Sequence, residues 1–101
     1  MRLEDKVAIL MGAGQGPGAE GTMGNGRATA LTFATEGAKV LCVDRDLGSA
    51  EETVALIRDA GGEAAAFAAD VTDEVAVKAA IEACAEKWGR IDILHNNVGI
   101  S

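Results

Sequence analysis

Residues 7–44 read VAILMGAGQGPGAEGTMGNGRATALTFATEGAKVLCVD, and this segment is the most informative part of the chain about its fold. It consists of an apolar run from Val7 to Met11, a glycine-rich loop, a segment with helical periodicity, and a second apolar run that leads into Asp44. Continuous apolar runs of this length are typical of strands covered on both faces in a parallel sheet. The stretch therefore predicts a strand, a loop, a helix and a second strand.

The loop has the composition of a phosphate-binding turn. A chain that leaves a parallel strand must turn sharply into its helix, and glycine permits the positive φ that such a turn needs. Glycine also lets a pyrophosphate approach the N–H groups at the start of the helix. Asp44 lies 18 residues beyond Gly26, at the end of the next strand, where a carboxylate can accept hydrogen bonds from a ribose. Together these features predict a dinucleotide site.

The rest of the chain continues the alternation of strands and helices. Glycines at 37, 61, 62 and 89 are the expected ends of three helices. Thr72 is the expected N-cap of the last helix, whose apolar stripe is Val77, Ala80, Ile81, Cys84 and Trp88. In chain order the predicted elements are strand 7–11, helix 27–36, strand 39–43, helix 49–60, strand 64–68, a helix from 72 to 88, and strand 91–95.

The order βαβαβαβ favours a parallel sheet with right-handed crossovers. We expect an α/β fold of the Rossmann type, a doubly wound parallel sheet with strand order 3-2-1-4 and ligand at the carboxyl ends of the first and fourth strands. Residues 1–101 are expected to form the dinucleotide-binding half of a single Rossmann-fold domain, so that the sheet is incomplete.

Composition narrows the possible partners. The chain has 49% hydrophobic residues and a net charge of −7, with nine Lys and Arg against sixteen Asp and Glu. This balance argues against a nucleic-acid or anionic-membrane partner. No apolar run is long enough for a bilayer and no signal peptide is evident, so we expect a cytoplasmic protein. Cys42 and Cys84 have neither metal-site nor CxxC spacing and are expected to be buried apolar residues.

These residues resemble the short-chain dehydrogenase/reductase family along the whole chain. The resemblance rests on a GxxxGxG-type turn, on the segments Gly26-Arg27-Ala28-Thr29-Ala30, Val43-Asp44-Arg45 and Asp70-Val71, and on Gly89-Arg90-Ile91-Asp92-Ile93-Leu94 before Asn96-Asn97-Val98-Gly99. The last segment is the most specific, because Asn-Asn-x-Gly after a fourth strand is not a general Rossmann feature. The resemblance implies nicotinamide chemistry and, in the full-length parent, a homo-oligomer.

Two alignments of the glycine motif are possible. Gly12, Gly16 and Gly18 already fit GxxxGxG, but helical periodicity begins only after Gly26. We therefore align Gly12 with the first motif glycine and Gly24 and Gly26 with the last two. The loop is then about eight residues longer than the family's usual turn, an extension that costs little entropy. It is either a tolerated surface insertion or a segment that wraps the cofactor or covers the substrate.

The resemblance also implies which residues bind the cofactor. Asp44 would accept both ribose hydroxyls and repel a 2′-phosphate, which favours NAD over NADP, although the adjacent Arg45 leaves NADP open. An ordinary helix-capping role for Asp44 and a turn role for Asp70 are the structural alternatives. The implied cofactor-binding residues are Gly12, Gly14, Gly24, Asn25, Gly26, Asp44, Arg45, Asp70, Val71, Asn97 and Gly99.

The sequence also departs from the family. Met11 stands where the family usually has a threonine that ties the first turn to the Asn-Asn segment, and His95 replaces an aliphatic residue and is expected to be structural. The family's catalytic pair is Tyr-Lys, and these residues include no tyrosine. We therefore expect no catalytic residue here, and a chain that is inactive without a C-terminal half carrying that pair.

Three functions remain open on this basis. The first is the cofactor-binding part of an NAD(H)-dependent oxidoreductase that interconverts an alcohol with a ketone or aldehyde in a small-molecule substrate. The second is a non-catalytic nucleotide-binding or interaction module. The third, a methyltransferase-like Rossmann domain, is disfavoured by Asn96-Asn97-Val98-Gly99.

Overall fold

The strand β1 (Val7–Met11) lies in the middle of the sheet, and all five of its residues are buried. A computed structural model describes residues 2–13 and 25–96 of the chain. Within these residues, four strands form one sheet in the order β3-β2-β1-β4, and every neighbouring pair is parallel. The predicted Rossmann-type topology is confirmed. The other strands are β2 (Lys39–Asp44), β3 (Ala64–Ala68) and β4 (Ile93–Asn96).

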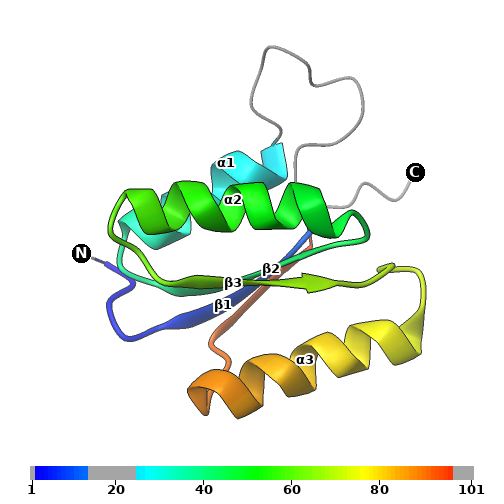
Figure 1. The fold of residues 1–101 in the computed structure, drawn as a ribbon. Coiled ribbons are helices and arrows are strands. Elements are labelled where there is room, and N and C mark those ends of the chain that lie inside the picture. The colour runs from blue at the N-terminus through cyan, green and yellow to red at the C-terminus, as the bar shows by residue number, and fades with distance from the viewer. Residues whose placement is uncertain (1, 14–24, 97–101) are drawn as a thin grey trace.

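Three helices in the described part of the chain cover the two faces of the sheet. Helices α1 (Asn25–Thr35) and α2 (Leu47–Asp59) lie on one face, and α3 (Glu74–Trp88) lies on the other (Figure 1). Each face has its own apolar cluster: Leu10, Val40 and Ile57 belong to the first, and Ile9, Val43 and Cys84 to the second. Alternate residues of the central strands point to opposite faces, which is why continuous apolar runs were needed.

Several element boundaries differ from those predicted. Helix α1 begins at Asn25, two residues before the start predicted at Arg27. The apolar periodicity did not reveal this first turn, because glycine has no side chain to contribute to the pattern. Helix α2 begins at Leu47 rather than Ser49, because the Asp46 carboxylate accepts a hydrogen bond from the Ser49 N–H at 3.1 Å and caps the helix.

The predicted N-cap of α3 is wrong. Asp73, not Thr72, caps this helix, and its carboxylate accepts hydrogen bonds from the N–H groups of Val75 and Ala76. The Thr72 hydroxyl donates instead to Oδ1 of Asp70 at 2.7 Å. A carboxylate at the N-cap also interacts favourably with the helix dipole.

Strand β4 begins at Ile93, two residues later than predicted, because Asp92 makes a different contact with β1. The Val7 N–H donates to the Asp92 carboxylate, and the Asp92 N–H donates to the Val7 carbonyl, both at 2.8 Å. A side chain thus replaces a backbone acceptor before the ladder begins at Ala8 and Ile93. Arg90 pairs with the same carboxylate at 2.7 Å.

The predicted glycine ends of the helices are confirmed where φ is described. Gly37, Gly61 and Gly89 have φ values of 101°, 91° and 77°, and they follow α1, α2 and α3 respectively. Cys42 and Cys84 are both buried and free, as expected. Among the described residues, no helix combines the length and apolar character that crossing a membrane would require.

Candidate cofactor site

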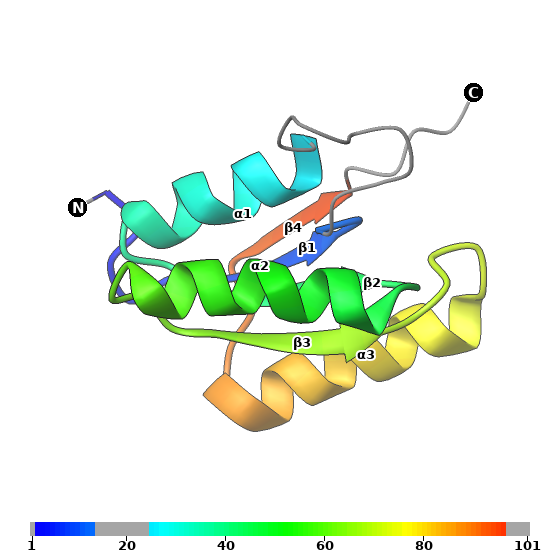
Figure 2. The same cartoon turned by 45° about the horizontal axis from the view of Figure 1, so that its top comes forward.

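The carboxyl ends of the strands meet at one edge of the sheet. Met11, the last residue of β1, is in register with Val43 of β2 and with Asn96 of β4. The next residue of β2, Asp44, is in register with Ala68 of β3. Figure 2 shows that the first turn of α1 lies at this same edge. In a doubly wound sheet, this is where ligands bind.

The chain turns sharply as it leaves β1. Gly12 has a φ of 78°, a conformation that a side chain would disfavour. The N–H groups of Gly12 and Ala13 both donate to the Val43 carbonyl, at 2.7 and 3.0 Å, and Ala13 is fully buried. The sharp turn predicted after the first strand is therefore confirmed, and the structure adds that the backbone of β2 fixes the start of the glycine-rich loop. Gly14 and Gly24 lie outside the described residues.

The helix that follows the loop starts where a phosphate-binding turn requires. Asn25 and Gly26 form the beginning of α1, and Gly26 is buried. The amino end of a helix carries unpaired N–H groups and a partial positive charge, which suit an anion. The predicted placement of this segment at the site edge is thus confirmed, whereas its contact with a cofactor stays a prediction.

Asp44 is the last residue of β2 and follows Val43, whose carbonyl holds the turn at Gly12 and Ala13. It is half-buried, and its Oδ1 accepts a hydrogen bond from the Asp46 N–H at 2.9 Å. The helix-capping role considered as an alternative for Asp44 belongs to Asp46. Arg45 is exposed, and its charge contributes to lowering the pKa of Asp70. The half-buried carboxylate of Asp44 thus lies at the sheet edge, one residue after the Val43 carbonyl that holds the Gly12–Ala13 turn.

Asp70 and Val71 come shortly after β3, the strand that pairs with β2. The Ala69 N–H donates to the Asp44 carbonyl at 3.1 Å, which joins the two strand ends. The Asp70 side chain accepts hydrogen bonds from the hydroxyl and the N–H of Thr72, and these bonds lower the pKa of its carboxyl. Asp70 thus has the turn role considered as an alternative, while Val71 packs partly against the α3 cluster. Asn97 and Gly99 lie outside the described residues.

Comparison with known proteins identifies this arrangement. The family model for short chain dehydrogenases matches residues 6–101. The chain belongs to the short-chain dehydrogenase family.

Individual members of the family are similar over nearly the whole chain. It is 44% identical over 99 residues to an uncharacterized oxidoreductase of Bacillus subtilis, covering 98% of this chain and 33% of that protein. It is 40% identical over 100 residues to D-threitol dehydrogenase of Mycolicibacterium smegmatis, covering 99% and 35%. The crystal structure of a hydroxysteroid dehydrogenase from Escherichia coli matches with a TM-score of 0.87 at 38% identity, covering 98% and 39%. The chain spans about a third of the length of the curated relatives it matches.

Two departures from the family pattern have clear structural environments. Met11 is buried in the apolar cluster on the α3 face, so its side chain packs there instead of hydrogen bonding as a threonine would. His95 of β4 is in register with Leu10, and its ring meets Phe33 of α1 edge to face at 5.8 Å. This packing agrees with the structural role expected for His95.

Two residues of the site region are not among those predicted from the sequence. Arg27 in the first turn of α1 and Thr53 in α2 are both buried, and Arg27 Nε donates to the Thr53 hydroxyl at 2.8 Å. A signal was available, since a cation in the first turn of a helix is unfavourable unless something specific holds it there. Periodicity alone could not supply the partner, because Thr53 is 26 residues away.

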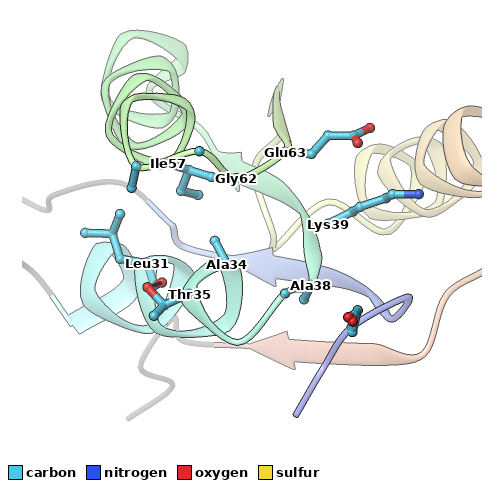
Figure 3. A pocket seen from close by; sticks show the side chains of 12 residues that line it. Leu31, Ala34, Thr35, Ala38, Lys39, Ile57, Gly62 and Glu63 are labelled. Carbon is cyan, nitrogen blue, oxygen red and sulfur yellow. Dashed lines mark hydrogen bonds between the residues drawn. The ribbon is translucent and has the colours of Figure 1, made fainter. Parts of the chain in front are cut away.

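A separate groove lies at the other edge of the sheet, near the amino ends of the strands. Figure 3 shows Leu31 and Ala34 of α1 facing Ile57 of α2 across it. Gly62 also lines the groove, and a Cβ added to it would lie 2.8 Å from Cγ2 of Ile57. Because parallel strands place their two ends at opposite edges, this groove is remote from the Gly12–Ala13 turn and is the seam where the two helices pack.

Proposed function

We propose that this chain is the dinucleotide-binding part of an NAD(H)-dependent oxidoreductase that interconverts an alcohol and a ketone or aldehyde. Membership of the short-chain dehydrogenase family supports the oxidoreductase class, since the family generally uses NAD or NADP. Similar proteins are named as a D-threitol dehydrogenase and as 7alpha-hydroxysteroid dehydrogenases, which supports a hydroxyl group as the reacting group of a small-molecule substrate.

The observation that carries the proposal is the position of Asp44. Asp44 is the last residue of β2. The carbonyl of the residue before it, Val43, accepts the hydrogen bonds that hold the Gly12–Ala13 turn. A dinucleotide needs both features at once: a glycine turn with the amino end of a helix for the pyrophosphate, and an acceptor one strand away for the ribose. The residues present therefore fit the cofactor.

Each part of the site has a distinct task in this proposal. Gly12 gives the backbone room to approach the pyrophosphate, and the first turn of α1 offers N–H groups to it. Asp44 accepts hydrogen bonds from the adenosine ribose, and Asp70 with Val71 borders the adenine. The bound nicotinamide supplies the hydride acceptor or donor. The groups that move the proton come from outside these 101 residues, which include no tyrosine.

The charge of Asp44 favours NAD(H) over NADP(H). A 2′-phosphate would bring negative charge against a half-buried carboxylate, which is repulsive at short range. Arg45 is the adjacent cation that would offset this repulsion, and its charge acts on Asp70. We therefore propose NAD(H) as the preferred dinucleotide.

The test is a titration of the full chain with NADH and with NADPH, followed by the cofactor's own fluorescence. We expect NADH to bind at least about tenfold more tightly, a difference of about 1.4 kcal/mol. Asp44→Ser should reduce or reverse this preference, while Asp46→Ser, which keeps a capping side chain next to the site, should not. Binding of neither dinucleotide would refute the proposal, and equal binding of both would refute the choice of NAD(H).

A further inference from the structure

Arg27 is an unusual residue for its position. It lies in the first turn of α1, where the helix dipole disfavours a cation, and its side chain is only 9% exposed. Its guanidinium donates to three groups of α2: the Thr53 hydroxyl at 2.8 Å, the Ser49 carbonyl at 3.0 Å and the Glu52 carboxylate at 3.1 Å. The fork geometry of arginine makes this possible, and lysine could not reproduce it.

Thr53 connects Arg27 to the start of the glycine-rich loop by a second hydrogen bond. A hydroxyl carries a single proton, and because the Thr53 oxygen accepts from Arg27 Nε, that proton is available for donation elsewhere. The nearer acceptor is the Ala13 carbonyl at 2.9 Å, against 3.3 Å for the Ser49 carbonyl. Donation by a charged group polarises the hydroxyl and strengthens its own hydrogen bond. Arg27, Thr53 and Ala13 therefore form one directed chain.

The turn after β1 is thus held from two directions. The Val43 carbonyl accepts from the N–H groups of Gly12 and Ala13, and the Thr53 hydroxyl donates to the Ala13 carbonyl. Because a peptide unit is planar, fixing the Ala13 carbonyl fixes the plane of the peptide that it belongs to. This peptide lies at the point where the chain enters the predicted phosphate-binding turn.

The chemistry of Thr53 is not what packing alone would select. Ala50, Val54 and Ile57 occupy the same buried face of α2 and are apolar. A buried polar network is costly unless every member is satisfied, and an apolar residue of similar shape commonly serves stability as well. Among residues 2–13 and 25–96, no buried side-chain nitrogen or oxygen lacks a partner, so the network of Arg27 and Thr53 is fully satisfied.

We propose that Arg27 and Thr53 are positioning residues for the dinucleotide, acting through the Gly12–Ala13 turn. They set the orientation of the turn before the cofactor arrives, so that binding does not have to order it. The proposal rests on the proposed function above, because it assumes that this turn receives a dinucleotide.

The test compares NADH affinity with stability in four variants of the full chain. Thr53→Val removes the hydroxyl, and Arg27→Lys keeps the charge but loses the fork. Each should weaken NADH binding about tenfold, the effect of losing one well-placed hydrogen bond. Thr53→Ser keeps the hydroxyl and should bind within about twofold of wild type. Ile57→Val, one turn further along α2 and fully buried, is the matched control: it should lower the melting temperature and leave NADH affinity unchanged.

A second measurement does not depend on the cofactor. After correction for each variant's global stability, amide hydrogen exchange at Gly12 and Ala13 should be faster in Arg27→Lys and Thr53→Val than in wild type. In Ile57→Val, the corrected exchange rate should equal that of wild type. Should Thr53→Val fail to fold, Arg27→Lys with Thr53→Ser carries both measurements.

The outcomes separate the two proposals. If wild type binds neither NADH nor NADPH, both the proposed function and the positioning role are refuted. If wild type binds NADH, and folded Thr53→Val and Arg27→Lys bind it equally well, only the positioning role falls. A loss of affinity that follows melting temperature in all variants, Ile57→Val included, would mark Arg27 and Thr53 as ordinary core residues and overturn the inference.

Discussion

Replacing Gly62 by alanine should destabilise the protein through one identifiable contact. A Cβ built at this position would lie 2.8 Å from Cγ2 of Ile57, 3.3 Å from the Ile57 carbonyl oxygen and 3.4 Å from Cβ of Ala34. Ile57 is fully buried and β-branched, so its methyl group cannot swing away freely. Figure 3 shows the two residues against each other at the groove.

The expected magnitude follows from two opposing effects. Overpacking a dense core costs about 1–3 kcal/mol. A glycine-to-alanine change also restricts the unfolded chain, which returns about 0.4–1 kcal/mol. The net loss for Gly62→Ala should be about 1–2 kcal/mol, and for a domain of this size each kcal/mol lowers the melting temperature by about 4–8 °C.

A double-mutant cycle identifies the cause. Ile57→Leu removes the Cγ2 branch and should relieve the clash, so Gly62→Ala should cost less in that background than in wild type. Ile57→Val keeps the branch and should not relieve it. Gly89→Ala is the control, because Gly89 has a φ of 77° with nothing within 4 Å of the added Cβ, so its cost should be the same in both backgrounds.

The assay is urea unfolding followed by fluorescence of Trp88, the single tryptophan of the chain. Its indole N–H donates to Glu63 at 2.7 Å, next to the mutated position, so it reports on this region. If Gly62→Ala is as stable as wild type or more stable, or if it costs the same in the Ile57→Leu background, the contact with Ile57 Cγ2 is not the cause.

Three further predictions follow from the structure. Asp92 has a lowered pKa because Arg90 and the backbone N–H of Val7 stabilise its carboxylate. Its contribution to stability is therefore complete above the unfolded-state pKa of about 3.9 and disappears as pH falls through the lower folded-state pKa. Melting temperatures between pH 2 and 5 should depend less on pH in Asp92→Asn than in wild type. Burial raises the pKa of the Cys42 thiol to about 12, so native protein at pH 8 should resist iodoacetamide at this residue until it is unfolded, as peptide mass mapping would reveal, and rapid native labelling would contradict the buried position. Asp73→Ala should cost about 1 kcal/mol in urea unfolding because it removes the cap of α3, whereas Thr72→Ala should cost clearly less, and the reverse order would restore Thr72 as the cap.

Much of the fold could be predicted from local sequence patterns. The five residues of β1 form an unbroken apolar run because both sheet faces are covered, and that run matches the strand residue for residue. The turn at Gly12 was also predictable, since few residues other than glycine adopt its positive φ readily. Asp44 was found because an acid directly after the second strand falls at the ligand-binding edge of any doubly wound sheet.

Other features depend on which of several candidate side chains makes a particular hydrogen bond to the backbone. Thr72 and Asp73 are both good N-cap residues, and only the hydrogen bond from Thr72 to Asp70 shows why Asp73 is the cap. The start of β4 was misplaced because Asp92 bonds to Val7, 85 residues earlier in the chain.

Local sequence patterns were sufficient to predict the order of the elements, the parallel sheet and the edge where its polar residues gather, because periodicity and glycine placement encode backbone conformation and burial. The three-dimensional packing was needed to show that Arg27 and Thr53 hold the Ala13 carbonyl, and that Gly62 lies against Ile57. Contacts of this kind arise where α1 and α2 pack side by side over the sheet. Their geometry depends on the shapes of all the side chains between the helices, which no local pattern of residues records.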